Sequence, residues 1–288
     1  ALNISIWQNT LVENFYPDNS FATKSVDDSA YVEARKVIIP GAGKPSNVKR
    51  NRTAKPATVN TRTDNALEYE IDELTTDPIY IPNADTVELS YDKRSSIISN
   101  DRSQLQNEAH LNLLERWGAG VPAANVLLTT GTIERDAHTS ETATGKRKRI
   151  TKDDLLAIMT RMDADNVPEE GRYILLDAYM YADLLADLTE SDKWMLQNSA
   201  NAQKGIVGNL WGLNVMKRSK VLRVKSDKTL LPWSEEAAAG ELAAALAWQE
   251  QSVSRALGEV KMFDSTNNPM YYGDIYSFLL RTGGSVRR

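Results

Sequence analysis

The sequence predicts an α+β protein in which strands and helices follow one another in groups. Residues 31–39 and 67–72 have the β-branched, aromatic and alternating apolar residues that are typical of strands. Residues 83–117 have apolar residues four positions apart, which is typical of a long helix. Strand, helix and strand patterns alternate over residues 173–216, which predicts a compact α/β unit.

The composition is that of a folded globular chain. The chain has 288 residues, of which 41% are hydrophobic and 25% are charged. This length predicts one large unit or two interlocked ones with a substantial core. Apolar runs such as 242–248 are much shorter than the roughly 20 residues that cross a bilayer, and residues 1–5 lack a signal-peptide pattern. We therefore expect no membrane partner.

The sequence offers little material for catalysis or metal binding. It has no cysteine, and its two histidines, His110 and His138, are not spaced as paired metal ligands or as part of a recognisable triad. We expect His110 to be a packed histidine. Adjacent acidic pairs at 153–154, 169–170 and 235–236 point apart on a helix or strand. We predict no catalytic, metal or cofactor-binding residue and no cofactor.

The first part of the chain predicts two extended features. Residues 1–23 have isolated apolar residues and a turn signal at 17–20, which is typical of an arm. The segment 41–63 separates the two predicted strands, 31–39 and 67–72, and is too long for a tight turn. We expect it to be a protruding loop or a long ribbon.

Charge divides sharply along this loop. Segment 41–63 has six basic residues and no acid, and segment 64–77 has six acids and no base. The basic tip could dock on the acidic surface of another copy, or the loop could simply be solvated beside an acidic strand; both interpretations stay open. The candidate contact residues are Lys44, Lys49, Arg50, Arg52, Lys55, Arg62, Glu68, Glu70 and Asp72.

The predicted long helix begins near Asn83 or Asp85, either of which can cap it, and ends before Gly118. Its apolar residues recur every four or seven positions, while the rest of its surface is polar. A narrow stripe should therefore be buried. The stripe consists of Tyr91, Ile98, Leu105, Ala109, Leu113 and Trp117.

Two features come before the α/β unit. Residues 125–130 resemble a strand, and the basic cluster 146–149 indicates a solvent-facing strand start more strongly than a polyanion site. A capping-box-like start at Thr151 then predicts a helix that stops at 166–168.

The rest of the chain alternates between strands and helices. Residues 173–176 predict a buried strand, and Asp177 should cap the helix that follows. Gly205, Gly208 and Gly212 match no phosphate-binding motif, so we expect turn and close-packing glycines. The further expected elements are strands at 213–216, 243–248, 260–263 and 275–281 and a short helix at 252–257.

Several stretches together resemble a known family. These are 167–177 (VPEEGRYILLD), 205–215, 247–260 (AWQEQSVSRALGEV) and 271–277 with Gly283-Gly284. In this order, after an arm, a long loop and a long helix, they resemble the major capsid protein of tailed bacteriophages, which has the Hong Kong 97-like fold. The similarity in order spans nearly the whole chain.

The resemblance implies a division of the chain. Residues 1–23 would be an N-terminal arm, and 24–82 an extended β-hairpin loop that reaches over a neighbour. Residues 83–150 would form a peripheral domain with a spine helix, 151–257 an α/β axial domain, and 258–288 the C-terminal return strands of the peripheral domain.

The resemblance also implies a function. The chain would be a structural shell protein that assembles with itself into hexameric and pentameric capsomers and an icosahedral shell around double-stranded DNA. Its other partners would be portal, scaffolding and decoration proteins, and the packaged DNA through non-specific inner-surface contacts. It would be assembled in the host bacterial cytoplasm and reside in the virion. Because the arm begins almost at Ala1, scaffold would come from a separate protein or a removed propeptide.

Other classes remain open. An encapsulin-type nanocompartment shell shares this architecture. A nucleic-acid-binding protein could use the basic segments 44–62 and 146–149, although the net charge of −5 is unlike that of a dedicated binder. An enzyme is the last alternative. Some relatives join a lysine to an asparagine between subunits, but we expect Lys44, Lys49 and Lys55 to be ordinary surface lysines.

Overall fold

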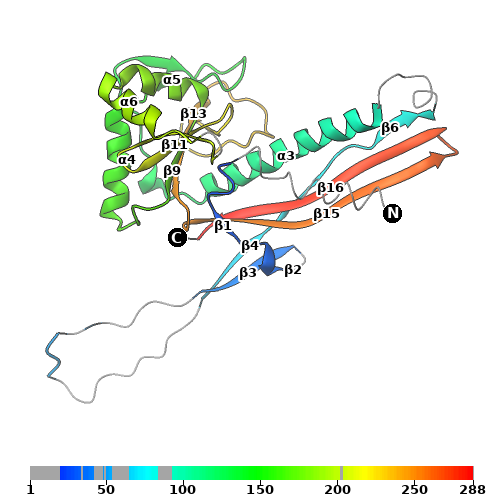
Figure 1. The fold of residues 1–288 in the computed structure, drawn as a ribbon, viewed down its shortest axis with the longest axis horizontal. Coiled ribbons are helices and arrows are strands. Elements are labelled where there is room, and N and C mark those ends of the chain that lie inside the picture. The colour runs from blue at the N-terminus through cyan, green and yellow to red at the C-terminus, as the bar shows by residue number, and fades with distance from the viewer. Residues whose placement is uncertain are drawn as a thin grey trace.

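The fold is described from a computed structural model. The described residues are 20–33, 35–41, 48, 50–53, 65–83, 93–201 and 204–287, with only the backbone described at 65 and 93–99. The chain forms an elongated part, in which a long helix lies along a long hairpin, and a compact α/β part at one end of it (Figure 1). No helix among the described residues is long and apolar enough to cross a membrane.

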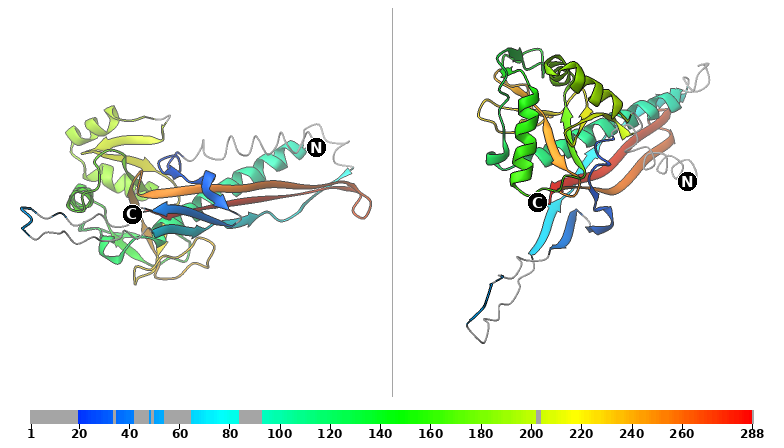
Figure 2. Two further views of the ribbon diagram at one scale, coloured as in Figure 1. Left: turned by 90° about the horizontal axis from the view of Figure 1, so that it is seen from below. Right: turned by 60° about the vertical axis from the view of Figure 1, so that its left-hand side comes forward.

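The elongated part is built on the hairpin of β15 (Val253–Asn268) and β16 (Gly273–Val286). Its sheet has the order β1-β15-β16-β5, and β6 also pairs with β16. The shorter strands are β1 (Val26–Asp27), β5 (Asp72–Thr75) and β6 (Ile79–Pro82). Helix α3 (Lys93–Ala119) has 27 residues and packs against β16, as Figure 2 shows from two further sides.

The compact part contains a four-stranded sheet in the order β10-β11-β9-β14. Strand β9 is parallel to β11 and antiparallel to β14, and β10 forms an antiparallel hairpin with β11. The strands are β9 (Arg172–Leu176), β10 (Ile206–Leu210), β11 (Leu213–Lys217) and β14 (Leu246–Gln249). The helices are α4 (Lys152–Ala164), α5 (Ala178–Asp187) and α6 (Glu190–Asn198).

Three small sheets and two short 3₁₀ helices complete the described fold. The three-stranded sheet β2-β3-β4 forms the base of the extended loop, and β7-β8 and β12-β13 are two-stranded. Their bounds are Val32–Glu33 (β2), Lys36–Gly41 (β3), Asn65–Glu70 (β4), Glu134–Asp136 (β7), Lys146–Lys148 (β8), Leu222–Val224 (β12) and Leu242–Ala244 (β13). The 3₁₀ helices are η1 (Ser29–Tyr31) and η2 (Ala123–Asn125).

Strand β9 joins the two parts because both of its faces are covered. Side chains of successive strand residues point to opposite faces. Ile174 and Leu176 pack among the apolar residues of α4, α5 and α6. Tyr173 and Leu175 pack in a second cluster with Trp117 of α3. The alternation therefore makes one strand part of both cores, and every residue of β9 is buried.

The described part of the stripe predicted for the long helix lies on its packed face, but the buried face is wider than predicted, because Leu111 and Leu114 are buried as well. Leu105 and Ala109 contact the hairpin cluster, whereas Leu113 and Trp117 belong to the cluster at the junction with the compact part. All four side chains are buried. Tyr91 lies outside the described residues, as do the rest of residues 84–92, where the helix was expected to begin, and the side chain of Ile98 is not described.

The local signals for helix starts are confirmed. Thr151 forms a capping box with Asp154, in which each side chain accepts a hydrogen bond from the other's backbone N–H. The Asp177 carboxylate accepts a hydrogen bond from the Met180 backbone N–H at 2.6 Å. After α4, Asn166 adopts a φ of 56° and ends the helix before Pro168.

Four predicted elements are wrong in kind or extent. Segment 31–39 is not one strand, because a turn after Glu33 folds β2 back on β3. Residues 125–130 form no strand: Asn125 is the last residue of η2, and 126–130 have no regular structure. The Thr130 backbone N–H donates a hydrogen bond to the Asp154 carboxylate at 3.0 Å. Segment 252–257 is the start of β15 and not a helix. The strand 243–248 is divided between β13 and β14, which belong to different sheets.

Long-range pairing explains the largest of these errors. The segment 253–257 has a helix-compatible composition, but it lies between β16 on one side and β1 on the other, with Ser254 paired to Ser285 and to Val26. Both partners are remote in sequence, and tertiary pairing of this kind overrides weak local propensity.

We expect Leu113→Ala to lower the free energy of unfolding by about 2 to 5 kcal/mol, because the leucine is fully enclosed at the junction of helix, hairpin and compact part. Urea unfolding followed by circular dichroism would measure it. Leu156→Ala is the matched control, because that leucine on α4 is 51% exposed and its loss should cost less than about 0.5 kcal/mol. An equal loss in the free energy of unfolding for the two variants would contradict the proposed packing.

Candidate functional site

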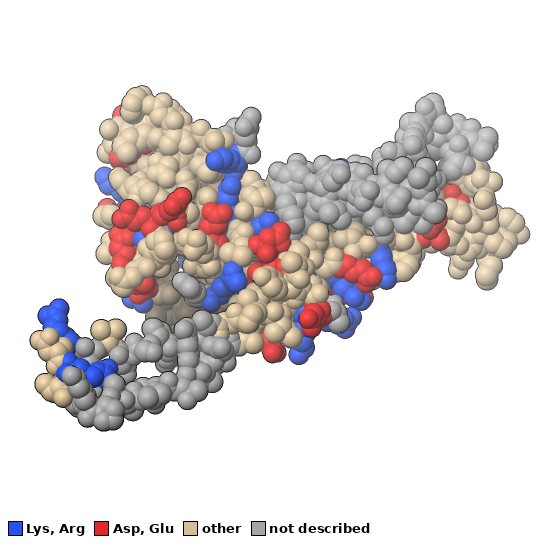
Figure 3. Space-filling view, turned by 60° about the horizontal axis from the view of Figure 1, so that its bottom comes forward, with Lys and Arg blue, Asp and Glu red and all other residues tan. Residues whose placement is uncertain are grey.

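The extended loop is the first candidate site for contact between copies. Its base is the antiparallel pair β3–β4, whose register runs from Lys36 opposite Glu70 to Gly41 opposite Asn65. Arg50 and Arg52, in the described part of the loop, are exposed. Figure 3 shows basic side chains at the tip of the loop. Lys44, Lys49, Lys55 and Arg62 lie outside the described residues.

The acidic residues at the base of the loop fall into two groups. Glu68 and Glu70 lie on β4 and are exposed, and Glu70 is only 3.9 Å from Lys36 across the sheet. Asp72 instead accepts hydrogen bonds from Asn112 Nδ2 at 2.8 Å and Arg116 Nε at 3.0 Å, both on α3. Its neighbour Glu73 forms an ion pair with Arg281 at 2.8 Å.

Asp72 therefore ties the base of the loop to the long helix. Burial alone would raise the pKa of its carboxyl, but hydrogen bonds from Arg116 and Asn112 and the charge of Arg116 outweigh it, so the pKa lies below its usual value. A carboxylate held in this way within the chain is not free to meet a neighbour. Of the acidic residues predicted for contact between copies, Glu68 and Glu70 remain exposed.

The tip of the β15–β16 hairpin carries an apolar surface that the sequence analysis did not single out. Met270 and Tyr272 are each 80% exposed, and Tyr271 is 55% exposed. Tyr80 on β6 lies beside them and donates its hydroxyl to the Tyr271 carbonyl at 2.5 Å. The signal in the sequence was a large apolar residue and two tyrosines within a turn rich in Asn, Pro and Gly, where polar residues are usual.

The basic cluster at 146–149 is not the solvent-facing run that was predicted. On β8, Lys146 and Lys148 are exposed, but Arg147 is buried and forms an ion pair with Asp183 of α5 at 3.0 Å. Arg149 donates to the Asp183 backbone carbonyl at 2.9 Å. The alternation of the strand sends every second side chain inward, so half of the cluster serves the compact part.

The glycines of the β10–β11 region have the structural roles predicted. Gly205 and Gly212 have φ values of 66° and 91°, a backbone region that favours glycine. A Cβ on Gly208 would lie 2.2 Å from the Leu196 carbonyl oxygen, so β10 can approach α6 only with glycine there. His110 is also packed, as predicted, with its ring edge-on to Phe21. Within the described part of the chain, no three His, Asp or Glu side chains gather as metal ligands.

Comparisons with solved structures show which proteins share this fold. The capsid protein of Ralstonia phage GP4 superposes with a TM-score of 0.62 over 92% of this chain and 83% of that one, at 13% identity. The capsid of Cyanophage P-SCSP1u gives a TM-score of 0.59 over 92% and 84%, at 16% identity. The fold is that of a phage capsid protein. No family model matches the sequence, and no curated protein matches it.

The capsid fold is not limited to phage particles. A virus-like particle from Pyrococcus furiosus superposes over 100% of this chain and 96% of that one, with a TM-score of 0.54 and 10% identity. These comparisons support the fold that the resemblance in the sequence predicts.

We expect Asp72→Asn to lower the free energy of unfolding at neutral pH by up to about 1 kcal/mol, because the partly exposed Asp72–Arg116 pair is lost. The folded-state pKa of Asp72 is depressed, so this contribution is complete above the unfolded value near 4 and disappears as pH falls through the folded-state value. The difference between wild type and variant in urea unfolding should therefore shrink on acidification.

Glu68→Gln is the control for this experiment. Glu68 lies on the same acidic segment, is exposed and has no ion pair with a described residue, so its substitution should leave stability unchanged at every pH. A loss as large as that of Asp72→Asn would show that general charge repulsion, and not the link to α3, governs this segment.

Proposed function

We propose that the chain is the major capsid protein of a tailed bacteriophage with the Hong Kong 97-like fold, which assembles with itself into an icosahedral shell around double-stranded DNA. The observation that carries the proposal is the likeness to phage capsid structures over more than nine-tenths of the chain. Hexameric and pentameric capsomers, a portal and scaffolding or decoration proteins would be the corresponding partners, in a virion assembled in the host bacterial cytoplasm.

Within this proposal each part of the fold has a role. The loop that reaches over a neighbour would be only the part of 24–82 from β3 to β4, following an arm at 1–23, because β1, β5 and β6 pair with the hairpin. The peripheral domain would be formed by α3 and the hairpin, and the axial domain that meets its copies at the capsomer axis by the compact part. The predicted boundaries at 150 and 257 both shift, because β8 packs on α5 and β15 of the hairpin already begins at Val253. The exposed apolar side chains at the hairpin tip support assembly with other copies, because exposed apolar patches mark sites of association.

Electron microscopy of the purified full chain, with mass photometry, tests the proposal. Closed shells or capsomer rings are the expected result, because the exposed apolar side chains of the hairpin tip would be buried against another copy. A stable 32.1 kDa monomer at every salt and protein concentration would contradict it.

A second candidate is an encapsulin-type nanocompartment shell. It is favoured by the likeness to the Pyrococcus furiosus virus-like particle, which covers the whole of this chain. Shells isolated from their natural source would contain protein cargo and no genomic DNA in that case. The nucleic-acid-binding alternative is weakened because Arg147, in the second basic segment, is buried in an ion pair.

The loop tip provides a sharper prediction. We expect Arg50→Glu with Arg52→Glu to leave the subunit folded, because exposed charge changes cost little stability. The double variant should assemble poorly, since like charges would meet where the basic tip approaches an acidic surface of another copy. Light scattering during assembly at several salt concentrations would measure this, and wild-type assembly should itself weaken with salt.

Lys225→Glu with Lys228→Glu is the matched control. It changes the net charge by the same amount on an exposed turn of the compact part. The control should assemble like wild type. If the Arg50/Arg52 variant assembled equally well at low and moderate salt, the loop would be merely solvated and its charge would carry no information for assembly.

A further inference from the structure

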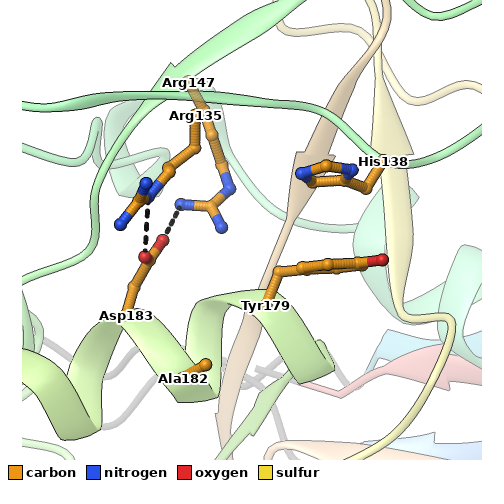
Figure 4. Close-up of a pocket in the computed structure, with 6 residues that line it drawn as sticks. All are labelled: Arg135, His138, Arg147, Tyr179, Ala182 and Asp183. Carbon is orange, nitrogen blue, oxygen red and sulfur yellow. Dashed lines mark hydrogen bonds and ion pairs between the residues drawn. The ribbon is translucent and has the colours of Figure 1, made fainter.

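The compact part contains a cavity with three charged side chains in its lining that the proposed shell function does not use. It lies between the β7–β8 sheet, the segment that joins these strands and helix α5, and its volume is about 230 Å³. Figure 4 shows the side chains that line it. They are Arg135, His138, Arg147, Tyr179, Ala182 and Asp183.

Positive charge exceeds negative charge around this cavity. The Asp183 carboxylate accepts one hydrogen bond from Arg135 Nε at 2.9 Å and another from Arg147 Nη1 at 3.0 Å. Arg149 adds a third guanidinium, bound to the Asp183 backbone carbonyl at 2.9 Å. Three guanidinium groups thus surround one carboxylate, and each of its two oxygens already accepts a hydrogen bond.

Arg147 is the group that points to a ligand. Its side chain is only 5% exposed, yet Nε and Nη2 have no hydrogen-bond partner among the described residues. These two nitrogens lie on one edge of the guanidinium, where their N–H bonds form the fork that fits two oxygens of a carboxylate or phosphate. Figure 4 shows this edge turned away from Asp183 and toward His138.

His138 supplies a second donor across the cavity. Its ring is stacked on Tyr179, with centroids 4.0 Å apart and planes 15° apart. The φ of His138 is 52°, so the chain turns sharply there and presents the imidazole toward the arginine. An imidazole N–H facing a guanidinium fork is an arrangement that an oxyanion between them would satisfy.

We propose that this cavity binds a small oxyanion, of the phosphate or carboxylate class, held by Nε and Nη2 of Arg147 and by the imidazole of His138. The physical reason is the cost of leaving charged donors buried without a partner, which an anion would remove. Asp183 and Tyr179 are positioning residues, because one orients the guanidinium and the other supports the imidazole. The inference does not depend on the proposed capsid function.

Isothermal titration calorimetry of the full chain with inorganic phosphate, and separately with acetate, tests the proposal. Sodium chloride at matched ionic strength corrects for screening. We expect saturable binding of one anion per chain in at least one titration, and the comparison of the two anions identifies which oxyanion fits. Absence of saturable binding of both anions would overturn the proposal.

Three variants connect binding to the site. Arg147→Gln should weaken binding about ten- to hundredfold, because a bidentate charge-assisted contact is lost. Since that change also removes a partner of Asp183 and can affect folding, His138→Ala gives an independent test at an exposed residue, with about tenfold weaker binding expected. Arg161→Gln, at an exposed ion pair on α4, should bind like wild type.

The pattern across the variants decides the result. Folding is checked for each by its circular dichroism spectrum. If His138→Ala bound the anion with wild-type affinity, the anion would lie elsewhere and the assignment would be overturned. The same would follow if Arg161→Gln lost as much affinity as His138→Ala.

Discussion

The packing of Trp117 between the two parts of the chain is the contact on which the rest of the structure depends. Its indole N–H donates to the Ser254 carbonyl of β15 at 2.9 Å, and its ring lies 5.5 Å from that of Trp248 in the compact part. Phe21 packs edge-on against the other side. A single buried side chain thus fixes the helix, the hairpin and the α/β sheet relative to one another.

This junction also explains a glycine near the end of the chain. A Cβ at Gly284 would lie 2.4 Å from Leu113 Cδ1 and 2.5 Å from the Ser254 carbonyl oxygen. Helix α3 can therefore pack closely on β16 only if that position has no side chain. The rigid frame formed in this way supports the hairpin tip, where Met270 and Tyr272 are exposed. The exposed side chains of such an element would be buried only against another molecule, as the proposed shell function requires.

Several charged residues near α3 and the hairpin are paired within the chain, whereas those described at the loop tip are exposed. Near the frame, acidic residues are bound within the chain, as Asp72 is by Arg116 and Glu241 by the buried Arg223 at 3.0 Å. At the loop tip, Arg50 and Arg52 are exposed. Internal pairs fix the direction in which an element leaves the body, whereas exposed charges remain available for steering and register. The oxyanion cavity is an intermediate case, with a buried guanidinium only half paired.

The sequence by itself determined the features that depend on neighbours in the chain. The helix caps at Thr151 and Asp177 follow from residues whose side-chain oxygens can accept from the first turn. The buried strand β9 and the four-residue spacing from Leu105 to Trp117 follow from apolar pattern and helix periodicity. Tertiary structure decided what depends on remote partners. Residues 253–257 became a strand because β1 and β16 flank them, Asp72 turned inward because Arg116 lies opposite, and Arg147 met Asp183 because β8 lies on α5. Local pattern carries no information about such partners, since they are chosen by the packing of the whole chain.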